Sequence, residues 1–207
     1  MCIRDRTFLE SNPSTRFSYS NWGYVTAGGW LEMLSSKPWE TLMEERIFNP
    51  LGLQSAGFGA ATGDAPWPHR DNGQPVNPTE SGADNAPVLG PAGTVHMSIR
   101  DLATYGAMHL AGSRGEPSLL PQGRFLELHV PTTGTAANAD YAYGWFVGDQ
   151  PQFLWHNGSN TMNFAYLLIL PAADAVIAIA TNQGGGNADD ALNAIQVEFL
   201  QYFSLAD

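Results

Sequence analysis

Two short stretches of the sequence hold side chains that could do chemistry. Residues 19–21 are Tyr, Ser and Asn, directly in front of a helix-like segment, and residues 156–159 are His, Asn, Gly and Ser. Hydroxyl, phenol and imidazole groups are the parts from which nucleophilic catalysis on a carbonyl is built. Both stretches also have a plain structural interpretation, in which Tyr19 is a core aromatic, Asn21 is a helix N-cap and His156 is a hydrogen-bonded strand residue.

Other kinds of site have little support. The five histidines show neither H-x-x-x-H nor a nearby acidic partner that would build a metal site. The glycines at 184–186 lack the pattern of a nucleotide-binding loop. Loop aspartates such as Asp64 and Asp84 have no apolar surroundings to raise a carboxyl pKa, so a glycosidase-type pair is disfavoured. We therefore expect no metal and no cofactor.

Composition indicates a globular domain without a nucleic-acid partner. The chain has 207 residues, of which 43% are hydrophobic and 14% charged, so a single domain is the default. Its formal net charge is -11, and Lys37 is its one lysine. Binding to phosphate backbones needs clustered cations, which no part of the sequence supplies. Cys2 is the only cysteine and cannot close an intramolecular disulfide, and no apolar run is long enough for a transmembrane helix.

Helical periodicity dominates the first two thirds. Residues 22–34 place Tyr24, Ala27, Leu31 and Leu34 on one apolar face, and Pro38 suits the first turn of a second helix that ends before residues 49–52. The glycines at 23, 28 and 29 predict that another element packs close to the first helix.

Later helices follow a long loop. Residues 55–91 are rich in proline and glycine with weak periodicity, which predicts a long irregular connection of the kind that borders a site. Ser98 is the expected N-cap, with Asp101 at the third position, of a helix that runs from Ile99 to about Leu110. A short helix is expected near residues 122–129.

The last third predicts a sheet. Residues 143–147, 153–156, 163–170 and 175–181 read as four strands of an antiparallel meander. An amphipathic helix follows, and its apolar stripe predicts that it lies across the sheet. The stripe consists of Leu192, Ile195, Phe199, Leu200 and Phe203. The fold class is α+β, with an antiparallel sheet flanked by helices.

Six short motifs, called landmarks below, follow one another along the chain: FSYSNWGY, IFNPLGL, PAGTVHMSIRDLATY, YGWFV, LWHNGSNTMNFAYLLILP and IATN. In this order, and on these helix and strand contexts, the chain resembles the serine β-lactamase-like hydrolases, the superfamily of class C β-lactamases, D-aminopeptidases and carboxylesterases. The resemblance spans nearly the whole chain from Phe17 onward. It implies a β-lactamase/transpeptidase-like fold and acyl transfer from a small-molecule ester or amide, without a cofactor.

The resemblance assigns roles to the first stretch. Tyr19 matches the family's catalytic tyrosine, which accepts or relays the proton of the nucleophilic serine. Asn21 matches the asparagine that hydrogen-bonds the substrate or the catalytic lysine, and Ser20 lies between them on the substrate side.

The second stretch matches the family's K-T-G position on the strand that lines the site. His156 stands where β-lactamases carry lysine, Asn157 and Gly158 are expected to contact substrate, and the backbone N–H of Ser159 is expected to form half of the oxyanion hole. A neutral imidazole binds a β-lactam carboxylate less well than an ammonium does, so histidine favours the esterase and peptidase branches over a true β-lactamase.

The family nucleophile is missing from this sequence. It belongs to an S-x-x-K motif, but Leu34 stands three residues before Lys37, the only lysine. We therefore expect an N-terminally truncated portion of one catalytic domain over residues 7–207, preceded by a non-native leader at residues 1–6 (MCIRDR). Such a chain is predicted to be inactive alone. The alternative is a non-catalytic ligand-binding or interaction module of the same fold.

Truncation predicts self-association. Phe164, Leu168 and Ile177 are expected to be left uncovered, and the sheet edge to be open, which favours poor solubility.

Overall fold

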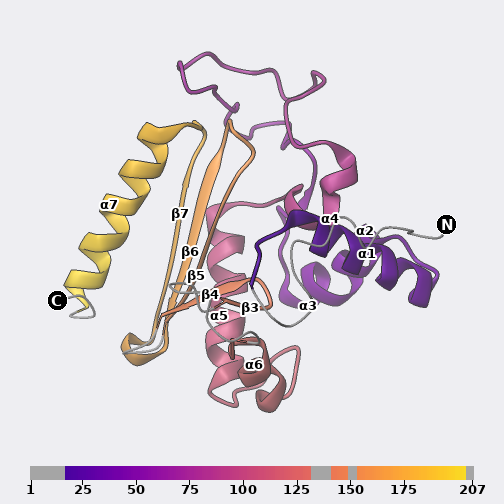
Figure 1. Cartoon of the computed structure of the whole chain (residues 1–207), viewed down its shortest axis with the longest axis vertical. Helices are drawn as coiled ribbons and strands as arrows, with labels where there is room; N and C mark the ends of the chain where they lie inside the picture. The colour runs from indigo at the N-terminus through magenta and orange to yellow at the C-terminus, as the bar shows by residue number, and fades with distance from the viewer. Residues whose placement is uncertain (1–16, 132–140, 149–152, 204–207) are drawn as a thin grey trace.

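A computed structural model describes residues 17–131, 141–148 and 153–203. The expected leader at residues 1–6 lies outside these ranges. An antiparallel sheet stands between α7 (Gly186–Tyr202) on one face and α5 (Ile99–Ser113) on the other, with the N-terminal helices to one side (Figure 1). The predicted α+β class is thus confirmed.

The sheet has five strands in the order β3-β4-β5-β6-β7, and every neighbouring pair is antiparallel. The strands are β3 (Tyr141–Ala142), β4 (Trp145–Gly148), β5 (Phe153–Ser159), β6 (Phe164–Leu170) and β7 (Ala175–Thr181). A short 3-10 turn, η4 (Pro171–Ala173), joins β6 to β7.

The strand predicted over residues 143–147 is wrong at its start. Tyr143 and Gly144 have φ angles of 41° and 98° and form the two-residue turn between β3 and β4. Two successive positive φ angles suit the twist of a tight hairpin. The sequence did not indicate this turn, because its alternating apolar residues are typical of a strand and tyrosine rarely adopts a positive φ.

Strand β5 is paired unequally on its two sides. Strand β6 pairs with it from Leu154 to Ser159, whereas β4 pairs with it only from Phe153 to Trp155. Beyond Trp155, no described strand covers the β4 side, so residues 156–159 keep one open edge. The prediction that this strand stops at His156 is wrong, because its pairing with β6 continues to Ser159.

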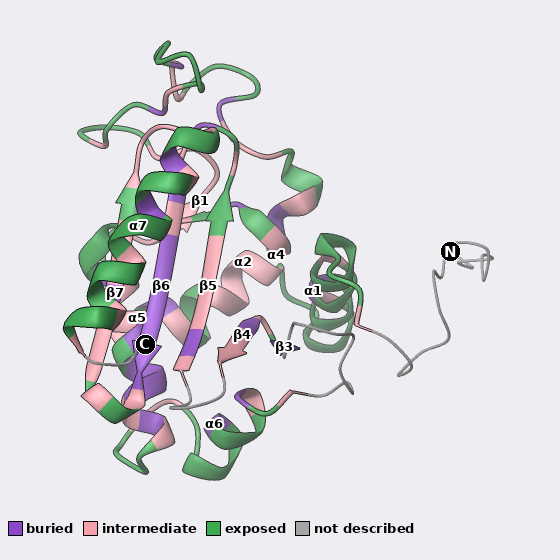
Figure 2. Cartoon of the chain, turned by 60° about the vertical axis from the view of Figure 1, so that its left-hand side comes forward, coloured by how far each residue is buried: buried purple, intermediate pink, exposed green. Residues whose placement is uncertain are grey.

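The core lies on both faces of β6, whose residues alternate between two clusters (Figure 2). Phe164, Leu168 and Ile177 pack in the cluster that Leu192 of α7 covers, and each is less than a tenth exposed. The expectation that these three are uncovered is therefore wrong, because α7 buries them. Strand β7 remains an edge among the described strands, so self-association stays a prediction.

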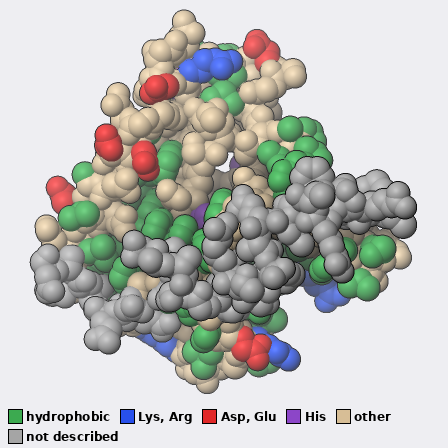
Figure 3. All heavy atoms as spheres, viewed as in Figure 1, with side chains coloured by type: hydrophobic (Ala, Val, Ile, Leu, Met, Phe, Trp, Pro, Cys, Tyr) green, Lys and Arg blue, Asp and Glu red, His purple; other side chains and the backbone are tan. Residues whose placement is uncertain are grey.

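Helix α1 (Asn21–Ser35) exposes its apolar stripe instead. Leu31 is 55% and Leu34 82% exposed, and hydrophobic side chains show over the region of α1 and α4 in Figure 3. Helix α1 contacts α4 (Gly90–Gly93) at Gly28, where an added Cβ would lie 2.5 Å from the side chain of Pro91. The close-packing prediction thus holds for Gly28 but not for Gly23 or Gly29, which have open space.

The second predicted helix is a continuous run of three short pieces. These are α2 (Trp39–Met43), the π-turn η2 (Glu44–Phe48) and α3 (Asn49–Leu51). Pro38 is the N-cap residue of α2 rather than part of its first turn. Gly52, at φ 68°, ends the run.

The long connection over residues 55–91 packs across one end of the sheet. It holds only β1 (Gly57–Phe58), which pairs with β2 (Val95–His96), and η3 (Pro87–Leu89). The His69 N–H lies 2.7 Å from the Asn182 carbonyl, and Asn160 Nδ2 donates to Asp84 at 2.8 Å. These bonds fix the loop beside the β5–β6 turn.

Helix α5 begins as predicted and packs on α6 (Gln122–Leu128). The Ser98 hydroxyl accepts the Asp101 N–H at 3.2 Å. A Cβ at Gly112 of α5 would lie 2.2 Å from the ring of Phe125, which is 1% exposed. At the same contact, the Nδ1 of His109 lies 3.0 Å from the Nε2 of His129, and both side chains are buried.

Replacing Gly112 by alanine tests the α5–α6 contact. The buried Phe125 ring has no free space to move into, so we expect Gly112→Ala to lower the free energy of unfolding by about 1–3 kcal/mol. Gly29→Ala is the matched control, because its Cβ meets open space in a helix interior, and it should stabilise by up to about 1 kcal/mol. Equilibrium urea unfolding measures both. Equal effects would contradict the packing described.

The buried histidine pair predicts acid sensitivity. Burial lowers the pKa of His109 from 6.5 to about 3 and that of His129 to about 4. Below about pH 6.5 the unfolded chain binds protons that the folded chain does not, so stability present above that pH is lost as the pH falls toward 4. His109 alone contributes a slope of up to about 1.4 kcal/mol for each pH unit. Urea unfolding between pH 7 and 4.5 measures it, and His109→Leu combined with His129→Leu should flatten the slope.

Candidate active site

Five of the seven predicted site residues line one hollow of about 330 Å³. They are Tyr19, His156, Asn157, Gly158 and Ser159, joined by the rings of Phe146 and Phe164. The hollow lies along the open edge of β5, where β4 has ended. Residues more than a hundred positions apart in the sequence therefore meet there.

Ser20 and Asn21 do not line this hollow. Ser20 has an extended backbone and occupies the N-cap position of α1, but its side chain makes no capping bond. Asn21 is the first helical residue and is exposed. The N-cap interpretation of Asn21 is therefore wrong by one position, because the chain enters the helix at Ser20.

Tyr19 is not a core residue. Its side chain is 52% exposed, and its ring meets Tyr141 edge-on at 6.0 Å and lies 6.1 Å from the His156 ring. The core-aromatic interpretation of Tyr19 is wrong. The phenol instead borders the hollow from the segment in front of α1.

His156 is held on both ring nitrogens. Its Nε2 lies 3.1 Å from the Tyr141 hydroxyl, and its Nδ1 contacts the carbonyl oxygen of Asn157. Burial lowers the pKa of His156 below 6.5, partly offset by the bond to the Asn157 carbonyl. The imidazole is therefore neutral at pH 7, unlike the lysine that the family carries at this place.

Two functional neighbours escaped the sequence analysis, Tyr24 and Tyr141. The Tyr141 hydroxyl lies 3.1 Å from Nε2 of His156, and burial is the main reason that the pKa values of Tyr24 and Tyr141 are raised above 10. Neither stands in a recognisable motif. The only signal was the density of tyrosines on either side of the YGWFV landmark.

The hydroxyl of Ser159 belongs to the β5–β6 turn. It donates to the Asn163 carbonyl at 2.8 Å and accepts the Thr161 N–H at 3.0 Å. Asn160 braces the same turn by accepting the backbone N–H groups of Met162 and Asn163. The Ser159 side chain is thus engaged in the turn, and its backbone is what it can offer to a ligand.

A second hollow of about 350 Å³ shares His156, Asn157 and Gly158 with the first. Its other walls come from four elements or their connections. They include Tyr24, Leu102, Tyr105, Tyr143, Trp145 and Leu167. Among the described residues, no Asp, Glu, Lys or Arg side chain lines either hollow.

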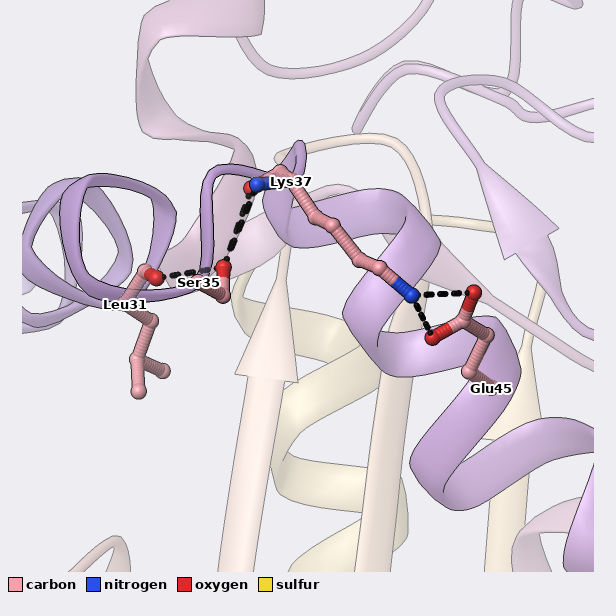
Figure 4. Close-up of polar contacts among 4 residues, drawn as sticks. All are labelled: Leu31, Ser35, Lys37 and Glu45. Carbon is pink, nitrogen blue, oxygen red and sulfur yellow. Dashed lines mark hydrogen bonds and ion pairs between the residues drawn. The ribbon is translucent and has the colours of Figure 1, made fainter.

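The one lysine of the sequence is engaged elsewhere (Figure 4). Lys37 Nζ lies 2.6 and 2.7 Å from the carboxylate oxygens of Glu45, and the Ser35 hydroxyl donates to the Leu31 carbonyl at 2.6 Å. Lys37 lines neither hollow. It forms a partly exposed surface ion pair, which contributes little to stability.

The described residues offer neither a metal-binding group nor a membrane-spanning helix. No group of three or more His, Cys, Asp or Glu side chains in these ranges could hold a metal ion. Within the same ranges, none of the helices has the length and apolar character needed to cross a bilayer.

The family model described as Beta-lactamase matches residues 5–201. The chain belongs to the beta-lactamase family of hydrolases. Penicillin-binding protein 4 of Amycolatopsis lactamdurans is 25% identical over 194 residues, covering 83% of this chain and 49% of that protein. The predicted resemblance to serine β-lactamase-like hydrolases is confirmed.

Solved structures agree on the fold. The crystal structure of SurE superposes with a TM-score of 0.74 at 26% identity, over 97% of this chain and 48% of that one. The D-amino acid amidase of Ochrobactrum anthropi SV3, complexed with D-phenylalanine, gives a TM-score of 0.68 at 20% identity, over 90% of this chain and 62% of that one. The chain spans about half the length of the curated relative it matches.

Proposed function

We propose that this chain forms one wall of the active site of a serine hydrolase that cleaves an ester or amide bond through an acyl-enzyme. The observation that carries the proposal is the open edge of β5 over residues 156–159, which faces Tyr19 across a hollow. An unpaired strand edge offers backbone donors and acceptors to an extended substrate. A phenol beside it can move a proton.

Each residue of the hollow has a role in this reaction. Tyr19 accepts the proton of the nucleophile or passes it to the leaving group, and its exposure leaves it free to reach both. Gly158 lets the substrate lie against the strand, because nothing stands within 4 Å of where its Cβ would be. The Ser159 backbone N–H stabilises the negative charge that develops on the carbonyl oxygen. Asn157 contacts the substrate from the same edge.

The nucleophilic serine and its lysine belong, in this proposal, to polypeptide outside the 207-residue sequence. The sequence has no S-x-x-K, and Lys37 is paired with Glu45. The second hollow shares residues 156–158 with the first and has mostly apolar walls. In this proposal, the segment that carries the nucleophile packs on the apolar surface of that hollow.

The lining favours a substrate with an apolar acyl group and no carboxylate. Tyr19, Phe146 and Phe164 supply aromatic surface, and His156 stands neutral at the place of a cation. Such a hollow binds a carboxylate poorly. Two of the similar structures contain D-amino acids, D-phenylalanine in the amidase and D-Leu in SurE, so D-amino-acid amides and esters are the substrates we favour.

The absence of a nucleophile within the sequence also favours a second candidate. A chain that keeps the hollow without a serine and lysine would serve as a ligand-binding module of the same fold. The two candidates differ in whether a covalent acyl-enzyme ever forms.

Covalent labelling separates them. The product of the source gene, extended upstream of Thr7, and the 207-residue chain are each treated with a fluorophosphonate and with benzylpenicillin, and the adduct is mapped by mass spectrometry. We expect the 207-residue chain to stay unlabelled and the extended product to carry its label on a serine followed three residues later by lysine. Tyr19→Phe in the extended product should slow labelling by about a hundredfold or more.

Two outcomes would overturn the proposal. A label on Ser20, Ser159 or another serine of the 207-residue chain would place the nucleophile inside it. An extended product that binds D-phenylalanine amide yet never forms an adduct would support the binding module instead.

A further inference from the structure

A chain of hydrogen bonds connects β3 to β5 through His156. The Tyr141 hydroxyl of β3 lies 3.1 Å from Nε2 of His156. The other ring nitrogen of His156, Nδ1, contacts the carbonyl oxygen of Asn157. The chain therefore ends on the backbone of the strand that lines the hollow.

The terminal carbonyl determines the direction of every bond in the chain. A carbonyl oxygen has no hydrogen to give, so Nδ1 of His156 must carry the proton. In the neutral imidazole Nε2 is then an acceptor, so the Tyr141 hydroxyl donates to it.

We infer that Tyr141 is a positioning residue, which holds His156 as the neutral Nδ1–H tautomer with its Nε2 lone pair occupied. The role falls to Tyr141 because, among the described residues, its hydroxyl is the one hydrogen-bond partner of Nε2. Its own burial keeps it a neutral donor: its side chain is 8% exposed.

Among the described residues, no charged side chain lines the hollows around His156 and opposes this tautomer. The titratable side chains that line the two hollows with His156 are all tyrosines, at positions 19, 24, 105, 143 and 166. Burial raises the pKa of Tyr24, and that of Tyr105 to about 12, so these two phenols are uncharged near neutrality. The lowered pKa of His156 agrees with a neutral ring.

The consequence deepens the proposed function and, in this respect only, rests on it. An imidazole whose Nε2 is capped by a phenol is neither a cation nor a free base toward the substrate. His156 instead fixes the backbone of β5 beside Gly158, and the same bonds tie that backbone to Tyr141 of β3. The enzyme would then bind its substrate through strand backbone and aromatic surface rather than through a charged side chain.

Nitrogen NMR of the 207-residue chain tests the tautomer without any need for activity. With ¹⁵N-labelled histidine, and with His156 assigned through the His156→Gln variant, we expect the hydrogen on Nδ1 and a hydrogen-bonded, unprotonated Nε2 at pH 7. Tyr141→Phe removes the donor without changing burial, so the Nε2 signal should shift to that of a free lone pair. The pKa of His156 should rise by about half a unit or more, since a bond that favours the neutral ring is lost.

Tyr202→Phe is the matched control, because Tyr202 of α7 is 81% exposed and lines neither hollow. It should leave the His156 signals and titration unchanged. If Tyr141→Phe does not fold, the tautomer of the wild-type ring remains the test.

The inference is overturned if the wild-type ring carries its hydrogen on Nε2, or if Tyr141→Phe leaves the Nε2 signal and titration as they were. Neither result would bear on where the nucleophilic serine lies, so this test and the labelling experiment fail separately.

Discussion

Everything proposed for this protein depends on the unequal pairing of β5. Strand β6 supports it to Ser159, whereas β4 ends opposite Trp155. Buried backbone groups must find partners, and in a sheet they normally find them on both sides. Here residues 156–159 have neighbours on one side only, and the other side faces a hollow instead of a strand. A ligand with a peptide-like backbone is the partner that such an edge accommodates best.

Two sets of contacts keep that edge in place. The long connection over residues 55–91 is tied to the β5–β6 turn and to the end of β7 through His69, Asn160 and Asn182. A further bond connects His156 to Tyr141 of β3. Because no described charged side chain lines either hollow, position rather than charge is what the fold provides there.

The sequence predicted the parts of the fold that local chemistry determines. Alternating apolar residues marked β5, β6 and β7, Ser98 marked the start of α5, and the ordered landmarks marked the family. Predictions failed where contacts between distant segments determine whether a side chain is buried. Leu31 and Leu34 form a helical stripe, yet no described element covers them. Phe164, Leu168 and Ile177 were expected to be uncovered because truncation was expected to remove the elements that pack on them, whereas α7, itself predicted to lie across the sheet, buries them.

The candidate site was predictable only in part, for the same reason. The landmark order singled out Tyr19, His156 and Gly158, and the fold does bring them together. Tyr141 could not be found, because its importance comes from a bond across the sheet edge to His156 rather than from a motif. Asn21 was misplaced by one helical position, a limit set by how little sequence distinguishes an N-cap from its neighbour.

The central claim is that the open edge of β5 binds an acyl substrate that lacks a carboxylate, and backbone NMR during titration of the 207-residue chain with D-phenylalanine amide tests it most directly. The account predicts that shifts concentrate at Tyr19 and residues 156–159, and that they vanish in Gly158→Val, a variant that should still fold because that position faces open space. Shifts centred elsewhere, such as on the exposed face of α1, or shifts that persist in Gly158→Val, would contradict it.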